Sequence, residues 1–358
     1  MSVSYNPLEN LVMAVTFDVS PEKEGSLLNY FYRQIFERPA EVRGVDLSGK
    51  TAIVTGSNTG IGRECSRQLL DLGLSKLILA VRNVAKGQAA AAELSMGRDL
   101  KEGAIEVWEL DYSSYDSIRS FVERTKTLER LHIVILNSAI ITTKINHNLK
   151  TGHEDIIQIN YISTALLTIL LLPVVKAKRV PTEPPGRITL VSSDTAAWAK
   201  LGDVDEGSII SSLDEHRKGL TGFNRVCISK LLGQLFLVEL AKRVSSSVTV
   251  VNTATPMMVY DSDFSRQTVT TFLGRIAEFF RRLIGYTSAV GARMVVDAAV
   301  RHGEETHGQY LGLHKLKPMA PIVYTPKGER LAATIWKETL QEFSFAGVED
   351  ILKEVNGR

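Results

Sequence analysis

The sequence TGSNTGIG, residues 55–62, contains the residue types that bind a phosphate group through the protein backbone. It follows a short apolar run and precedes a helical pattern. Glycines allow a tight turn and a close approach of the backbone to a pyrophosphate, and the N-terminus of the next helix offers N–H groups to an anion. A glycine-rich turn without a ligand is the alternative. The predicted cofactor-binding residues here are Gly56, Ser57, Asn58, Thr59, Gly60, Ile61 and Gly62.

Arg82 stands twenty residues after Gly62, at the end of the next predicted strand. An acidic side chain at such a position binds the ribose of NAD(H), whereas a guanidinium pairs with the 2'-phosphate of NADP(H). The sequence therefore favours NADP(H) as the cofactor. A solvated cation at a strand end is the alternative interpretation of Arg82.

Short apolar runs alternate with helical patterns along most of the chain. The predicted strands span residues 50–56, 76–82, 104–110, 131–137, 187–193 and 247–252. The predicted helices span residues 63–73, 84–96, 116–128, 154–172 and 226–243. Such alternation is typical of right-handed crossovers and of a parallel sheet with helices on both faces. The predicted fold class is α/β, a doubly wound parallel sheet in a single domain.

The predicted domain, residues 49–315, is flanked by an N-terminal extension, residues 1–48, and a C-terminal extension, residues 316–358. In the first extension Ser20 can cap a helix that Pro21 opens. We expect this helical extension to dock on the main body through one apolar stripe, which contains Leu27, Leu28, Phe31 and Ile35.

A second amphipathic pattern lies in the segment 256–286, which follows the sixth predicted strand. We expect this segment to be a helical lid over the substrate or a helix packed on the body, with a membrane-surface anchor as the alternative. Its apolar residues are Phe272, Leu273, Ile276, Phe279, Phe280, Leu283 and Ile284.

Composition narrows the classes of partner. The 358 residues include 42 basic and 40 acidic side chains, a net charge of +2, so no global field attracts nucleic acid. Cys65 and Cys227 have neither the spacing of a disulfide framework nor that of metal ligands, so we expect no metal and a reducing compartment. The N-terminus lacks the pattern of a secretory signal, and the apolar run 165–177 is too short to cross a bilayer. We expect a cytoplasmic protein with a small-molecule substrate, with a homodimer as the candidate assembly.

Together these motifs resemble the short-chain dehydrogenase/reductase family over roughly residues 49–315, and this resemblance implies a Rossmann fold. The glycine spacing is the family's own, Asp111, followed by Tyr112, is similar to its adenine-contacting acid, and LNSA with Asn137 and Ala139 is similar to its Asn-Asn-Ala-Gly turn. The extended ends are similar to those of long members from fungal natural-product pathways. The resemblance assigns the catalytic asparagine, serine and lysine to Asn160, Ser193 and Lys230.

The family's catalytic tyrosine is replaced in this sequence. In the family it exchanges a proton with the substrate, and it stands four residues before the lysine, where this chain has Val226. A valine has no ionisable group and cannot do this chemistry. Ile140 stands where the Asn-Asn-Ala-Gly turn has its glycine, and Pro256-Met257 stand for a Pro-Gly pair. The resemblance therefore implies an intact adenosine and pyrophosphate end and a rebuilt nicotinamide end.

Few residues could replace the tyrosine, and each has a plainer use. Cys227 fits a buried thiol, Asp194 a helix cap or a solvated carboxylate, Tyr161 and Tyr260 aromatic packing, and His216 a solvated side chain. We expect a non-redox step, such as cyclisation, isomerisation or dehydration, on an apolar substrate in a pocket lined by Ser193, Asn160, Lys230 and Asp194. An NADPH-dependent carbonyl reductase with a substitute donor and a catalytically silent binding protein are the alternatives.

Overall fold

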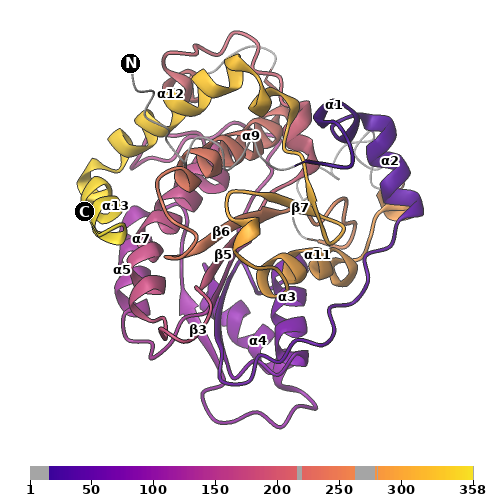
Figure 1. Cartoon of the computed structure of the whole chain (residues 1–358), viewed down its shortest axis with the longest axis vertical. Coiled ribbons are helices and arrows are strands. Elements are labelled where there is room, and N and C mark those ends of the chain that lie inside the picture. The colour runs from indigo at the N-terminus through magenta and orange to yellow at the C-terminus, as the bar shows by residue number, and fades with distance from the viewer. Residues whose placement is uncertain (1–15, 216–219, 263–278, 280, 358) are drawn as a thin grey trace, which may run out of the picture.

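The computed structural model describes residues 16–215, 220–262, 279 and 281–357. At its centre lies an eight-stranded sheet of order β3-β2-β1-β4-β5-β6-β7-β8 (Figure 1). Neighbouring strands pair in parallel except β7 and β8, which are antiparallel. The strands are β1 Thr51–Thr55, β2 Lys76–Val81, β3 Ile105–Glu109, β4 Ile133–Leu136, β5 Arg187–Val191, β6 Val250–Ala254, β7 Tyr310–Gly312 and β8 Lys315–Lys317.

This topology confirms the doubly wound α/β fold. All six predicted strands are present, and β6 begins three residues later than the apolar run at 247 suggested. The sequence did not predict β7 and β8, because strands of three residues are too short to produce a recognisable apolar run. The sheet thus extends to Lys317, past the predicted domain boundary at residue 315.

Helices cover both faces of the sheet (Figure 1). They enclose two large apolar cores. On β1, Ile53 packs into one core while its neighbours Ala52 and Val54 pack into the other, as the two-residue period of a strand requires. One core includes the helices α3 Gly60–Asp71, α4 Val84–Ser95 and α11 Ser288–Val300. The other includes α5 Tyr115–Thr125, α7 Ser163–Ala177 and α9 Gly222–Ala241.

A long apolar helical stretch precedes β5. It consists of α6 Asp155–Ile157, the π-helical turn η1 Gln158–Ile162, and α7. Among the described residues, this stretch, Asp155–Ala177, is the one helix long and apolar enough to cross a membrane by length and composition. Its most apolar window is 89% buried inside the protein, which is the placement of a core helix.

The C-terminal extension packs on the second core. Its helix α12 Pro326–Glu342 lies against α9, and α13 Val348–Val355 lies against α7. The insert between β5 and α9 contains the 3-10 turn η2 Asp194–Trp198 and the helix α8 Ile209–Asp214. Further single turns are η4 Glu304–Thr306, η5 Pro321–Tyr324 and η6 Ser344–Ala346.

The N-terminal extension docks on the body, but not through the predicted face. Its helices are α1 Pro21–Glu24, which Ser20 caps as predicted, and α2 Leu27–Phe36. The residues of α2 that are buried are Tyr30, Arg33 and Gln34, whereas Leu28 of the predicted stripe is 87% exposed. The predicted docking stripe is therefore wrong, because the polar face of α2 has specific partners on the body.

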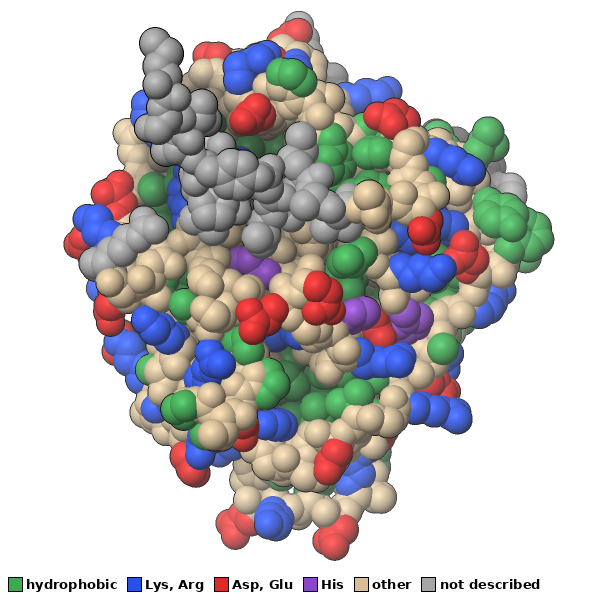
Figure 2. Space-filling model, viewed as in Figure 1, with side chains coloured by type: hydrophobic (Ala, Val, Ile, Leu, Met, Phe, Trp, Pro, Cys, Tyr) green, Lys and Arg blue, Asp and Glu red, His purple; other side chains and the backbone are tan. Residues whose placement is uncertain are grey.

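The apolar face of α2 points to solvent instead. Figure 2 shows apolar side chains gathered on the outer side of the region where Figure 1 places α2. Its large apolar side chains with at least 40% exposure are Leu27, Leu28, Phe31, Tyr32, Ile35 and Phe36.

The predicted amphipathic lid helix lies mostly outside the described residues. The described part consists of Phe279 and residues 281–284, which are helical, and both Phe279 and Leu283 are exposed. The base of the segment is closed by the bridge between Val259 and Tyr286.

Candidate active site

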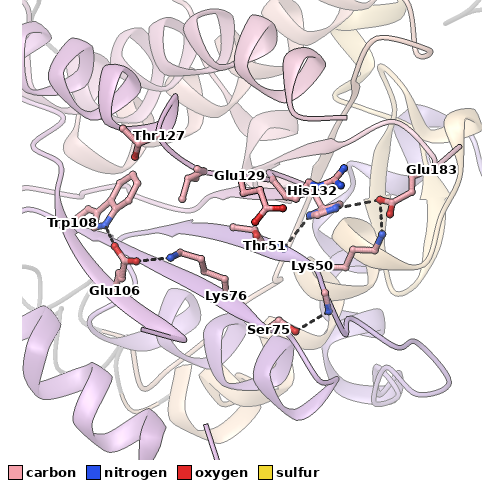
Figure 3. A pocket seen from close by; sticks show the side chains of 13 residues that line it. Lys50, Thr51, Ser75, Lys76, Glu106, Trp108, Thr127, Glu129, His132 and Glu183 are labelled. Atoms are coloured by element: carbon pink, nitrogen blue, oxygen red, sulfur yellow. Dashed lines mark hydrogen bonds and ion pairs between the residues drawn. The ribbon is translucent and has the colours of Figure 1, made fainter. Parts of the chain in front are cut away.

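One cavity, of about 690 Å³, lies at the sheet edge where the strands begin (Figure 3). Both of its lysines are paired with acidic residues: Lys50 Nζ lies 2.7 Å from Glu183 Oε2, and Lys76 Nζ lies 2.5 Å from Glu106 Oε1. Open α/β sheets bind ligands at the opposite edge, outside the carboxyl ends of the strands. The candidate active site is therefore the set of loops that follow β1, β2, β4, β5 and β6.

The loop after β1 has the backbone that its glycines were expected to allow. Gly56 and Gly60 have φ angles of +63° and +56°, in the left-handed region that favours glycine. Gly62 is required for a different reason, since a Cβ atom there would lie 2.5 Å from the carbonyl oxygen of Gly56 and 2.6 Å from Asn137 Nδ2. Position 62 is thus packed too closely for any larger side chain.

The same loop leaves the start of α3 open to an anion. Thr59 is the N-cap residue, but its side chain makes no capping hydrogen bond, and no acidic residue lies in the first turn. The Ser57 hydroxyl is buried and has no hydrogen-bond partner among the residues that the structure describes. Asn58 and Ile61, in the same loop and the first helical turn, are partly exposed. Free N–H groups and an unpaired buried hydroxyl fit a bound phosphate group.

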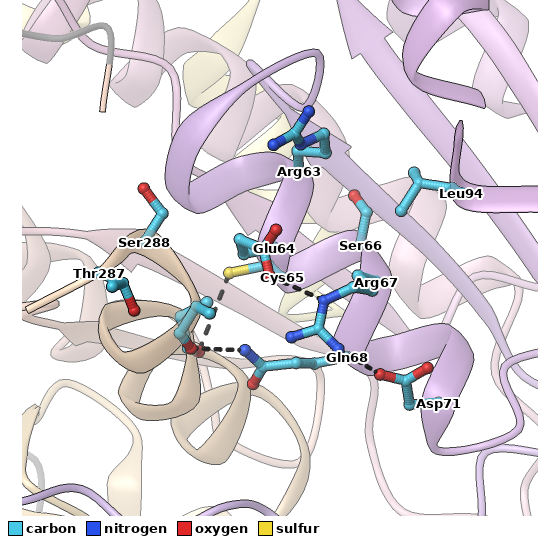
Figure 4. A network of polar contacts seen from close by, with 12 residues as sticks. Arg63, Glu64, Cys65, Ser66, Arg67, Gln68, Asp71, Leu94, Thr287 and Ser288 are labelled. Atoms are coloured by element: carbon cyan, nitrogen blue, oxygen red, sulfur yellow. Dashed lines mark hydrogen bonds and ion pairs between the residues drawn. The ribbon is translucent and has the colours of Figure 1, made fainter. Parts of the chain in front are cut away.

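Contacts with α11 fix the position of α3. Gln68 Nε2 donates a hydrogen bond of 2.7 Å to the carbonyl oxygen of Ala289, and Cys65 Sγ lies 4.0 Å from that of Ala292. Figure 4 shows Cys65 and Gln68 on the side of α3 that faces the start of α11. Burial raises the pKa of Cys65, which is a free, buried thiol as expected. These contacts hold the helix N-terminus beneath the glycine-rich loop.

The three residues predicted to bind the adenosine end lie in different environments. Arg82 directly follows β2 and is exposed, as a contact with a 2'-phosphate requires. Asp111 follows β3, and its Oδ1 accepts hydrogen bonds from the backbone N–H and the hydroxyl of Ser113. The Tyr112 side chain is buried, with its hydroxyl 3.2 Å from Thr55 Oγ1, so it supports the loop from below and does not line the cleft.

Asn137 joins the loop after β4 to the loop after β1. Its Nδ2 donates a hydrogen bond of 3.0 Å to the carbonyl oxygen of Thr55, and its backbone N–H donates one of 2.9 Å to Thr55 Oγ1. Ala139 and Ile140 follow and are partly buried. The ends of β1 and β4 are thereby held together beneath the cofactor cleft.

Asn160 lies in the π-helical turn η1, and its amide is fully used by its neighbours. Its Oδ1 accepts a hydrogen bond of 2.7 Å from the backbone N–H of Ile140, and its Nδ2 donates one of 2.9 Å to the carbonyl oxygen of Ile140. Nδ2 also lies 3.3 Å from Ser229 Oγ on α9. The asparagine thus positions the loop after β4 against α9.

Lys230 and Ser193 both lie near the end of β5. Lys230 Nζ donates a hydrogen bond of 2.7 Å to the carbonyl oxygen of Val191, two residues before Ser193. Burial lowers the pKa of Lys230 to about 8. Ser193 Oγ accepts a hydrogen bond of 2.9 Å from Thr195 Oγ1. The structure therefore gathers the serine, the lysine and, through Ser229, the asparagine around the first half of α9.

Val226, the residue that the resemblance places at the tyrosine position, lies on α9 and is 4% exposed. Of the candidate replacement donors, Asp194 is buried in an ion pair with Arg33 of α2, 3.1 Å from Nη2, and accepts a hydrogen bond of 2.6 Å from Thr255 Oγ1. This arrangement gives Asp194 a structural use.

Of the other candidate donors, Tyr161 is engaged in the core. The Tyr161 hydroxyl hydrogen-bonds Thr339 of α12 in the core. Tyr260 lies at the base of the 256–286 segment, where its backbone N–H bonds the carbonyl oxygen of Tyr286. His216 lies outside the described residues.

Cys227, beside Val226, is the remaining candidate. Burial raises the pKa of its thiol to about 11, although a hydrogen bond with the Thr195 side chain opposes the shift. The thiol is therefore neutral at physiological pH. It lies at the end of a short row of polar groups that continues through Thr195 to Ser193.

Of two residues that shape this end of the site, sequence reasoning missed one and named the other. Arg33, from the extension, gave no signal because an arginine in an amphipathic helix normally faces water. Met257 did give a signal, as a replacement for glycine. Its φ angle is +55°, a conformation uncommon for residues other than glycine, and its side chain packs with Tyr30 of α2.

Known proteins are similar to this chain in both sequence and fold. The family model of short chain dehydrogenases matches residues 50–202. A relative from Aspergillus ruber, named short-chain dehydrogenase fogG, is 46% identical over 345 residues, which cover 95% of this chain and 99% of the relative. A short chain dehydrogenase/reductase named mfmJ, from Annulohypoxylon moriforme, is 40% identical over 332 residues, covering 92% of this chain and 95% of the relative.

Solved structures show the same fold at lower identity. An uncharacterised protein from Mycobacterium paratuberculosis superimposes with a TM-score of 0.58 at 24% identity, covering 84% of this chain and 95% of the other. A short chain dehydrogenase from Shigella flexneri, complexed with NADP, gives a TM-score of 0.53 at 18% identity, covering 76% of this chain and all of the other. Because the curated relatives match over nearly their full length and the family model matches residues 50–202, the chain belongs to the short-chain dehydrogenase/reductase family.

Proposed function

We propose that this protein binds NADP(H) in the cleft at the carboxyl ends of the strands and catalyses a non-redox step on a small apolar substrate. Cyclisation, isomerisation and dehydration are the candidate reactions, in a fungal natural-product pathway and in the cytoplasm. The coarser assignment, a family whose members are generally oxidoreductases with a nicotinamide cofactor, follows from the matches above. The finer assignment rests on the nicotinamide end of the cleft.

The observation that carries the proposal is the buried Val226 at the position of the proton donor. A general acid or base contributes about a hundredfold to ten-thousandfold to such a reaction. Two of the possible substitutes are engaged elsewhere, because Asp194 is paired with Arg33 and the Tyr161 hydroxyl is bonded to Thr339. The thiol of Cys227 is a weak donor. Positioning of a reactive apolar substrate, in contrast, needs no strong acid.

The remaining polar groups can bind and orient an oxygen atom of the substrate. Ser193 and Thr195 offer hydroxyl groups, and Lys230 offers an ammonium group whose lowered pKa, about 8, still leaves it mostly protonated at neutral pH. The residues for NADP(H) are those of the glycine-rich loop and Arg82. The cofactor supplies a hydride in this family, and here it would also complete one wall of the pocket.

The experiment compares wild-type protein with two variants on a panel of apolar aryl ketones, β-hydroxyketones and enones in the presence of NADPH. Absorbance reports NADPH consumption, and mass spectrometry distinguishes a product heavier by two hydrogen atoms from one of unchanged mass or one lighter by a water. Val226→Tyr restores the family's phenol four residues before Lys230, on the same helix face. Val226→Phe is the matched control, because it has the ring without the hydroxyl.

We expect no NADPH consumption by the wild type and by Val226→Phe, and ketone reduction by Val226→Tyr at least about a hundredfold faster. A wild-type product of unchanged mass, or of mass less one water, supports the non-redox step. Rapid NADPH consumption by the wild type would instead show a reductase with a substitute donor. Binding of NADPH without a product from any substrate would favour a silent binding protein.

A further inference from the structure

A second cavity, of about 540 Å³, lies between the N-terminal extension, the loop after η2 and the start of α9. Most of its wall is apolar, and its apolar side chains are Leu27, Trp198, Leu201, Leu220, Phe223 and Cys227. Among its polar residues, Asn224 is already engaged, because its amide makes hydrogen bonds of 2.9 and 2.8 Å with the backbone N–H and carbonyl of Lys200. Such a lining fits an apolar ligand better than a polar one.

The cavity adjoins the catalytic end of the cleft. Cys227, which lines it, is the neighbour of Val226 on α9, and its thiol hydrogen-bonds Thr195 next to Ser193. Trp198, which also lines it, ends the turn η2 that Ser193 caps. Cys227 therefore links the lining of this cavity to Thr195 and Ser193 through hydrogen bonds.

The outer wall of the cavity belongs to the N-terminal extension. Leu27, the first residue of α2, lines the cavity and is 55% exposed. The extension also holds the Trp198 ring in place. Trp198 Nε1 donates a hydrogen bond of 2.8 Å to the carbonyl oxygen of Gly25, and the Tyr30 ring packs edge-on against the Trp198 ring at 4.9 Å. These contacts come from a segment that precedes the residues matched by the family model.

We propose that the N-terminal extension is a substrate-specificity element, and that the apolar, ring-containing part of the substrate binds between Leu27, Trp198 and Phe223. This inference rests on the proposed function, since it assigns a binding place to the apolar substrate of the same site. The volume of the cavity is within the range of pockets for small organic ligands, about 300–1,000 Å³. A ring that enters it covers the exposed part of Leu27 and packs on the edge or face of the indole.

The test measures binding without requiring turnover, with 2-acetonaphthone as the probe and the full-length protein saturated with NADP⁺. Isothermal titration gives the dissociation constant for the wild type, Leu27→Glu and Leu28→Glu. Leu28 is the matched control, because it is the next residue of α2, is 87% exposed and does not line the cavity. Quenching of tryptophan fluorescence gives a second readout, because Trp198 lines the cavity and the other two tryptophans, Trp108 and Trp336, are buried in the core.

We expect Leu27→Glu to weaken binding by about tenfold or more, since a charge next to an apolar ring is left poorly solvated. Leu28→Glu should match the wild type, and Trp198→Phe should remove most of the quenching while binding is weakened only moderately. Equal affinities of Leu27→Glu and Leu28→Glu, or no binding of the probe by the wild type, would overturn the inference. If the wild type consumes NADPH while Leu27→Glu still binds the probe weakly, the non-redox proposal fails and the specificity element stands.

Discussion

The two ends of the cofactor cleft are built by different parts of the chain. The phosphate end is assembled from β1, β4, α3 and α11, through contacts such as those of Asn137 with Thr55 and of Gln68 with Ala289. The nicotinamide end is assembled with the N-terminal extension, through the ion pair of Arg33 with Asp194. We therefore expect a change of residues at one end to leave the packing of the other largely the same.

Gln34 connects the N-terminal extension to the segment after β6. Its Oε1 accepts a hydrogen bond of 2.9 Å from the backbone N–H of Met258, and its Nε2 donates one of 3.1 Å to the carbonyl oxygen of Ile284. One buried side chain of α2 thus bonds both ends of the segment 256–286. Met257, which departs from the family pattern, lies in the same interface as the docking face of α2.

The largest expected effect follows from removing Arg33. Arg33→Ala leaves the buried carboxylate of Asp194 without its cation, and it leaves Glu24, 2.8 Å from Nη1, with only the longer contact of 3.6 Å to Lys317 Nζ. Breaking a buried pair in this way costs about 3–5 kcal/mol in the free energy of unfolding, which urea denaturation measures. Arg43→Ala is the control, because the Arg43 side chain is 83% exposed and its pair with Glu41 is worth less than about 1 kcal/mol.

The same variant tests whether the two ends are independent. Under native conditions, Arg33→Ala should bind adenosine 2',5'-bisphosphate, which has no nicotinamide, with the affinity of the wild type. A loss of affinity for this probe as large as the loss for NADPH would show that the extension supports the whole cleft.

The second effect concerns the phosphate end alone. If Arg82 binds the 2'-phosphate, Arg82→Ala should weaken NADP⁺ by about tenfold, the lower part of the range for a charged hydrogen bond because Arg82 is exposed. The affinity for NAD⁺ should not change, and calorimetry with both ligands provides the control within one protein. Equal preference of the wild type for the two cofactors would contradict the assignment.

The third effect is a dependence of the free energy of unfolding on pH, and its cause is His153. Burial alone would lower the pKa of His153, but its contacts with Asp214, 2.7 Å from Nδ1, and Glu342, 3.2 Å from Nε2, raise it to about 9. A histidine whose folded pKa exceeds its unfolded value, 6.5, stabilises the protein fully below pH 6.5. This contribution is lost as the pH rises through 9.

Between pH 6.5 and pH 9.5 the wild type should lose stability on the order of 2 kcal/mol through His153. The variant His153→Gln should not show this loss. The difference between the two urea profiles isolates His153 from Lys230, whose lowered pKa of about 8 acts in the opposite direction in the alkaline range. Parallel profiles for wild type and variant would show that the contacts with α8 and α12 do not depend on the charge of His153.

The accuracy of the sequence analysis differs between the two ends for a physical reason. The glycine-rich loop could be predicted because its function depends on local backbone geometry, and Gly56, Gly60 and Gly62 have the conformations and close contacts expected. The structural pairing of Asp194 could not be predicted, because its partner Arg33 lies 161 residues away in the sequence.

The error on α2 has a related cause. An apolar stripe predicts the buried face of a helix only when burial of apolar area dominates the docking free energy. Here Arg33 and Gln34 dock through an ion pair and three hydrogen bonds to the body, with Asp194, Met258 and Ile284 as partners. Periodicity contains no information about such specific polar partners.

The smallest expected effect tests the strained residue at the nicotinamide end. Met257 has a φ of +55°, which costs a residue with a Cβ about 1 kcal/mol, yet its buried side chain packs with Tyr30 of the extension. Met257→Ala keeps the strain and loses the packing, whereas Met257→Gly loses the packing and relieves the strain. The glycine variant should therefore be about 1 kcal/mol more stable than the alanine variant in urea, although it has the smaller side chain and a more flexible unfolded state. If alanine is the more stable of the two, the backbone at this position is relaxed, and the methionine is explained by its contact with the extension alone.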